Sequence, residues 1–85
     1  MKVRKPTVEE IDIAGNWEFW SKEPSKFAWY YDEAETCYIL DGKAEVIAES
    51  GDKIQFSKGD WVEFEKGLRC TWEITEEIQK KYLFG

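Results

Sequence analysis

The chain of 85 residues contains no histidine, two cysteines and two prolines. Without histidine it cannot form a Ser-His-Asp triad, and it lacks the commonest side-chain ligand of metal ions. No apolar run approaches the roughly 20 residues of a membrane-spanning helix, and no apolar segment of a signal peptide follows residues 1–6. We therefore expect a cytoplasmic protein whose Cys37 and Cys70 stay reduced.

The charge balance is acidic, with twelve basic and eighteen acidic residues and a net charge of −6. No basic cluster is interleaved with aromatic residues, and no glycine-rich loop of the phosphate-binding kind is present. This composition argues against nucleic acids and anionic membranes as partners, and the surplus of acidic residues is typical of a soluble surface.

Apolar and polar residues alternate with a period of two from residue 35 onward, which indicates strands. We expect strands at residues 35–40, 43–49, 53–57, 62–65, 68–75 and 78–84, joined by turns that include a hairpin turn at Asp41-Gly42. An aromatic strand at 27–31 and a short helical turn capped by Thr7 precede them. Short strands with closely spaced turns predict an all-β antiparallel sandwich or barrel.

Two segments resemble the signature motifs of cupins. Glu35 and Gly42 have the spacing of the first motif, and Gly59 and Gly67 have that of the second. The strings at 35–38 and 67–72 are similar to small stand-alone cupins related to ureidoglycine aminohydrolase and the ethanolamine-utilisation cupin. The resemblance implies a single domain over residues 1–85, an antiparallel cupin barrel or jelly-roll-like sandwich with a short N-terminal arm at 1–15.

The resemblance also implies a degenerate metal site. Cys70 stands where the second motif has a histidine, and the two histidines of the first motif fall near residues 28 and 30, or 29 and 31, none of which is a usual ligand. Of the usual ligand set only Glu35 remains. The ureidoglycine enzyme depends on manganese, whereas here we expect no cofactor, or at most a weakly held divalent metal.

Two charged residues fall on strand faces that should point into the barrel. Glu35 shares its face with Cys37 and Ile39, and Lys80 shares its face with Tyr82. A buried carboxylate and a buried ammonium each need a partner, so we expect these two to pair. The pair can anchor a ligand or supply acid, base or nucleophile, which makes both residues candidate catalytic groups. Alternatively, Glu35 only holds a loop and Lys80 reaches solvent at the barrel mouth.

The remaining candidate pocket residues are aromatic or carry sulfur: Trp29, Tyr31, Cys37, Cys70, Trp72 and Tyr82. Such aromatic residues belong to a core more often than to a ligand cage. For the cysteines we expect buried apolar thiols, with a soft metal site beside Glu35 or a reactive pair as alternatives.

Three functions follow from these residues. The favoured one is binding of a small polar metabolite in the barrel. The others are a reaction of the aminohydrolase or lyase kind at Glu35 and Lys80, and a purely structural role. A homodimer is expected, because small cupins have exposed sheet edges that often pair.

Overall fold

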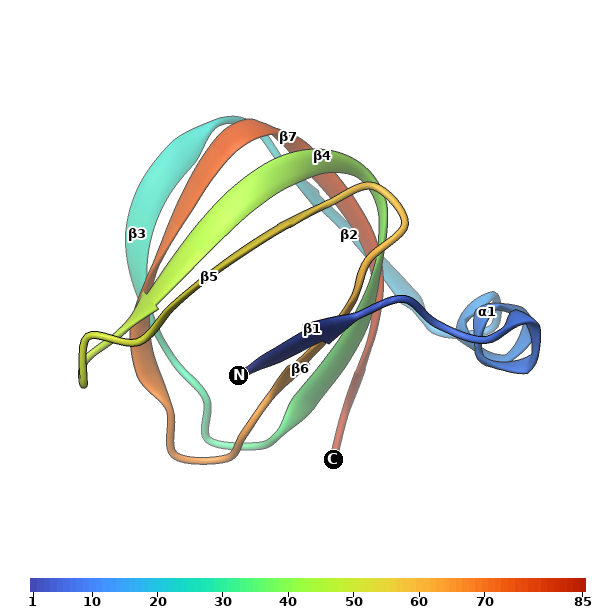
Figure 1. The fold of residues 1–85 in the computed structure, drawn as a ribbon, viewed down its shortest axis with the longest axis horizontal. Coiled ribbons are helices and arrows are strands. Elements are labelled where there is room, and N and C mark those ends of the chain that lie inside the picture. The colour runs from blue at the N-terminus through green and yellow to red at the C-terminus, as the bar shows by residue number, and fades with distance from the viewer.

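The computed structural model describes residues 1–85 and contains seven strands and one short helix. All seven strands belong to one antiparallel sheet that curls around an interior space (Figure 1). The elements are β1 (Lys2–Arg4), α1 (Val8–Ala14), β2 (Glu18–Lys22), β3 (Ser25–Tyr30), β4 (Glu35–Ala48), β5 (Lys53–Ser57), β6 (Trp61–Phe64) and β7 (Arg69–Phe84). The prediction of an all-β antiparallel fold is confirmed.

Two long strands, β4 and β7, form the spine of the sheet. They pair from Glu35 opposite Phe84 to Ala48 opposite Cys70. The shorter strands each cover half of a long one: β6 and β5 pair with the two halves of β4, and β2 and β3 pair with the two halves of β7. One half of the sheet thus faces the other, as in a sandwich (Figure 1).

The sheet bends between its two halves at Gly42. The sequence predicted a hairpin turn there, and that prediction is wrong. β4 continues through Asp41 and Gly42, and its register against β7 shifts at three places between Ile39 and Ala44. Gly42 has a φ of 95°, and a Cβ there would collide with the Glu77 carbonyl oxygen. The Asp-Gly pair therefore marks a β-bulge that bends one continuous strand. The two strands expected at 68–75 and 78–84 are likewise one strand, β7, which pairs with β4 on both sides of the bulge.

The other expected turns are confirmed, with Gly51, Gly59 and Gly67 all at positive φ. The expected cap is also present: the Thr7 side chain accepts from the Glu10 backbone amide, and the Glu10 carboxylate accepts from the Thr7 amide. Hydrogen bonds from Arg4 and Thr7 lower the pKa of Glu10 to about 2.

In the expected arm, β1 pairs with β6 and extends the sheet. The seven-residue α1 is too short to cross a membrane, and no longer helix occurs.

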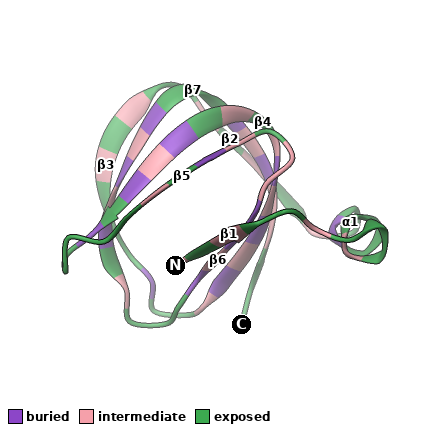
Figure 2. Ribbon diagram, in the orientation of Figure 1, coloured by how far each residue is buried: buried purple, intermediate pink, exposed green.

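Burial alternates along β4 and β7, so that one face of each strand points inward (Figure 2). The interior holds one cluster of twelve buried residues, among them Trp72, Phe64, Phe56 and Ile78. Only two buried residues are charged, Glu35 and Lys80. The core is thus apolar except where these two side chains meet.

Gly42→Ala should destabilise the protein by about 3 kcal/mol, because it adds a backbone collision to an unfavourable φ. Gly51→Ala is the matched control, since Gly51 has a φ of 100° but nothing within 4 Å of an added Cβ. It should cost about 1 kcal/mol. Urea unfolding of both variants measures the difference, and equal losses would show that the close approach at Gly42 does not matter.

Candidate functional site

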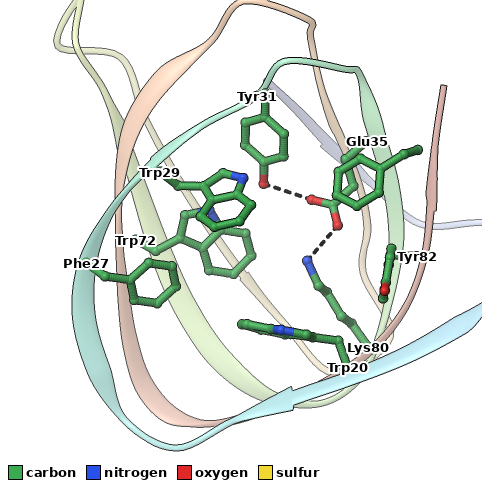
Figure 3. Close-up of a pocket in the computed structure, with 9 residues that line it drawn as sticks. Trp20, Phe27, Trp29, Tyr31, Glu35, Trp72, Lys80 and Tyr82 are labelled. Atoms are coloured by element: carbon green, nitrogen blue, oxygen red, sulfur yellow. Dashed lines mark hydrogen bonds and ion pairs between the residues drawn. The ribbon is translucent and has the colours of Figure 1, made fainter.

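A cavity of about 200 Å³ lies between the two halves of the sheet (Figure 3). From one half, β2 and the end of β7 contribute Trp20, Lys80, Tyr82 and Phe84. From the other half, β3 and the start of β7 contribute Phe27, Trp29 and Trp72. Tyr31 and Glu35 complete the wall. The cavity exists because the bend brings the two halves of β7 to opposite sides of it.

The polar part of this wall is a chain of three hydrogen-bonded side chains. The Lys80 ammonium donates to Glu35 Oε2 at 2.7 Å, and the Tyr31 hydroxyl donates to Glu35 Oε1 at 2.8 Å. Both charged side chains are buried, with Glu35 only 2% and Lys80 7% exposed. No buried side-chain nitrogen or oxygen lacks a partner. The pair predicted from the sequence is present, and Tyr31 completes it (Figure 3).

Three aromatic rings surround the Lys80 ammonium. Its Nζ lies 4.7 Å from the Trp20 ring centroid, 4.9 Å from that of Trp72 and 5.6 Å from that of Tyr82. Ring faces at these distances stabilise a cation. Glu35 is the only hydrogen-bond acceptor of this ammonium, so its remaining N–H donors are available to rings or to a molecule in the cavity.

The neighbouring hydroxyl and thiol groups are held in their protonated forms. Burial, reinforced by the charge of Glu35, raises the pKa of Tyr31 far above its usual value. Burial also raises the pKa of Cys37 to about 12, against a smaller opposing effect of Lys80. Burial likewise raises the pKa of Cys70 to about 11. Tyr31, Cys37 and Cys70 are consequently neutral, and the ion pair of Glu35 with Lys80 supplies the charges of the site.

Six of the residues proposed from the sequence meet around the cavity: Trp29, Tyr31, Glu35, Trp72, Lys80 and Tyr82. The two cysteines proposed with them do not line it. Cys37 is fully buried on the same strand face as Glu35, and the Cys70 thiol donates instead to the Trp29 carbonyl at 3.6 Å. Both positions are inward-facing, as expected, but they belong to the core.

Three lining residues were missed: Trp20, Phe27 and Phe84. The alternation of the sequence could have identified two of them. Phe27 alternates with Trp29 along one strand, and Phe84 shares the inward face of Lys80 and Tyr82. Trp20 could not be found in this way. It lies opposite Lys80 in the pairing of β2 with β7, a neighbour relation that only the topology reveals.

The residues of this site do not suit a metal ion. No group of three His, Cys, Asp or Glu side chains converges anywhere in the structure. The one carboxylate at the cavity is already bonded to an ammonium and a hydroxyl, and the nearest thiol is protonated. The ammonium of Lys80 supplies the positive charge next to Glu35 that a metal ion would otherwise supply.

Comparison with known proteins agrees with this fold. The sequence profile of the EutQ-like cupin domain matches residues 10–82. The chain belongs to the EutQ-like cupin family. The ethanolamine-utilisation part of the resemblance seen in the sequence is thereby confirmed, while the part concerning ureidoglycine aminohydrolase stays a prediction.

Solved structures place this cupin among proteins of the same fold. A DUF861 family protein from Thermotoga maritima is 49% identical and has a TM-score of 0.95, over 99% of this chain and 98% of that one. The EutQ protein of Clostridium difficile is 21% identical, with a TM-score of 0.71, over 78% of this chain and 52% of that one. The latter likeness shows the fold alone. A comparison with curated proteins gave no match.

Neither cysteine of this cupin should react with Ellman's reagent at pH 8 while the protein is folded. The reagent needs a thiolate, and a thiol with a pKa of about 12 is ionised in roughly one molecule in ten thousand at that pH. Both thiols should react at once in denaturant. Rapid modification of Cys37 in the folded protein would contradict its placement in the core.

Proposed function

We propose that this cupin binds a small, planar, uncharged molecule in the cavity beside Lys80. The observation that carries the proposal is a buried ion pair in a wall that is otherwise aromatic. Aromatic side chains supply flat contact area, and a few placed polar groups orient a ligand, which is the usual composition of a small-molecule site.

The volume of the cavity sets the size of the ligand. An apolar cavity of about 150 Å³ holds one benzene molecule, so about 200 Å³ suits a single ring with one small substituent. Larger metabolites with several polar groups would not fit inside. The sequence suggested a polar ligand, whereas seven of the nine lining residues are hydrophobic.

The charges of the wall favour a neutral ligand. Glu35 and Lys80 compensate each other, and Tyr31 occupies the second carboxylate oxygen. An anion or a cation would add an uncompensated charge in a buried place, which is costly. A neutral molecule with a hydrogen-bond acceptor can instead accept from the unused N–H donors of Lys80.

The cavity has an open side through which a ligand can enter. Trp29 and Phe84 line it, yet they are 47% and 41% exposed. Trp29 lies near the end of β3 and Phe84 at the end of β7. These two rings therefore mark the mouth of the cavity, and a purely structural cupin would have no need of such an opening.

A cytoplasmic location and a homodimer stay predictions from the sequence.

Benzyl alcohol should bind with a Kd on the order of a millimolar or tighter, as expected for a ligand of this size. Trp20→Ala should weaken binding at least about tenfold, because it removes a wall of the cavity. Phe19→Ala is the control on the same strand, since Phe19 is 52% exposed and does not line the cavity. Amide chemical shifts in NMR titrations report both affinity and location.

Benzoate tests the charge argument, because it has nearly the shape of benzyl alcohol but carries a negative charge. It should bind more weakly than the alcohol. Tighter binding of benzoate would mean that a ligand carboxylate displaces Glu35 from Lys80. Binding of neither compound, or unchanged binding in Trp20→Ala, would overturn the proposed function.

A further inference from the structure

We infer that Lys80 forms an imine with a small conjugated aldehyde bound in the cavity. This inference rests on the proposed function and names the class of ligand, an uncharged aldehyde attached to a flat ring or double bond. It follows from the placement of one amine, one base and three ring faces around the same small space.

Lys80 has the neighbours that an amine nucleophile needs. Its Nζ lies 2.7 Å from Glu35 Oε2, within reach for direct proton transfer. It belongs to the cavity wall, so a carbonyl carbon in the cavity can approach it. Glu35 is kept in place by the Tyr31 hydroxyl on its other oxygen. An adjacent base positioned by a third group is the usual arrangement around an activated nucleophile.

The reaction balances with these groups alone. Glu35 takes a proton from the ammonium, and the freed amine forms a bond to the carbonyl carbon while the C=O π electrons move to oxygen. That oxygen receives the proton from Glu35, which then removes a second proton from nitrogen. Glu35 passes this proton to the hydroxyl group, and water leaves as the nitrogen lone pair forms the C=N bond. An ammonium and an aldehyde have become a protonated imine and water, and Glu35 is again a carboxylate.

The product suits the site as well as the free lysine does. A protonated imine keeps the positive charge of the ammonium, so Glu35 remains its counterion at the same place. The faces of Trp20, Trp72 and Tyr82 stabilise a cation whose charge extends over the conjugated ligand.

The chain provides its own comparison lysines. Lys5, Lys43 and Lys53 have side chains that are 74%, 60% and 54% exposed, and each pairs with a carboxylate outside the cavity. Lys81, beside Lys80, donates to the Trp17 carbonyl and does not line the cavity. An aldehyde that reacts with amines at random should label the exposed lysines first. An aldehyde that binds in the cavity should instead label Lys80.

The test is to incubate the protein with benzaldehyde and cyanoborohydride and to map the modified lysines by peptide mass spectrometry. We expect one benzyl group on Lys80, formed at least tenfold faster than on any exposed lysine. Excess benzyl alcohol, which fills the cavity but has no carbonyl, should suppress the labelling of Lys80. Lys81→Met should label like the unchanged protein.

Glu35→Gln tests the proton transfers separately from binding. Glutamine keeps one carbonyl acceptor, which can accept from Lys80, and turns its amide N–H donors toward the Tyr31 hydroxyl, but it cannot carry a proton. Labelling of Lys80 should slow at least tenfold when the variant and the unchanged protein are compared at equal occupancy of the cavity, with the affinity of each for benzyl alcohol measured separately. If this variant does not fold, the competition between benzaldehyde and benzyl alcohol in the unchanged protein still decides.

The outcomes separate the two proposals. Binding of benzyl alcohol without selective labelling of Lys80 overturns the imine and leaves the proposed function standing. Labelling that benzyl alcohol does not suppress also overturns the imine. Absence of both binding and selective labelling overturns the two proposals together.

Discussion

The ion pair between Glu35 and Lys80 places the strongest demand on the rest of this structure. Taking two charges out of water costs several kcal/mol for each ion, and their attraction offsets this only when their hydrogen bonds are complete. In this site a 2.7 Å contact and a tyrosine satisfy both carboxylate oxygens, and three ring faces surround the ammonium, whose remaining N–H donors have no hydrogen-bond acceptor. Three aromatic side chains, Trp20, Trp72 and Tyr82, thus surround the ammonium of one ion pair.

The bend at Gly42 makes this arrangement possible. β4 and β7 carry Glu35 and Lys80 on one half of the sheet, while Trp72 comes from the other half of β7. Only a sheet folded over itself can bring Trp72 and Trp20 to the same ammonium. The backbone approach between Gly42 and Glu77 is the point where that fold occurs, so the geometry of the site depends on a glycine that does not line it.

Local patterns in the sequence predicted those features that depend on neighbours along one strand. Alternation identified the inward faces, and hence the burial of Glu35 and Lys80 and their need to pair. The same reasoning failed at Asp41-Gly42, because an Asp-Gly pair suits a hairpin turn and a bulge equally well, and only the register against β7 distinguishes them. Trp20 was missed for a related reason, since its contact with Lys80 depends on how β2 pairs with β7.

The cysteines show a further limit of sequence patterns. Cys37 and Cys70 have inward positions like those of the lining residues, yet neither side chain reaches the cavity wall. Alternation indicates which side of a sheet a residue faces, but how far a side chain extends toward the centre depends on the packing of larger neighbours. Short thiols therefore stay in the core, whereas longer side chains on the same strand faces line the cavity.

On the proposed function, the Glu35–Lys80 pair serves a ligand and is not needed to hold the fold together. The most direct test is the free energy of unfolding of a variant that combines Tyr31→Phe, Glu35→Met and Lys80→Met. Replacing a buried ion pair by apolar residues of similar volume is often neutral or stabilising by about 1–4 kcal/mol. We therefore predict a variant at least as stable as the unchanged protein, to within about 1 kcal/mol. A loss of about 3 kcal/mol or more would show that the pair is a structural element and would contradict the account.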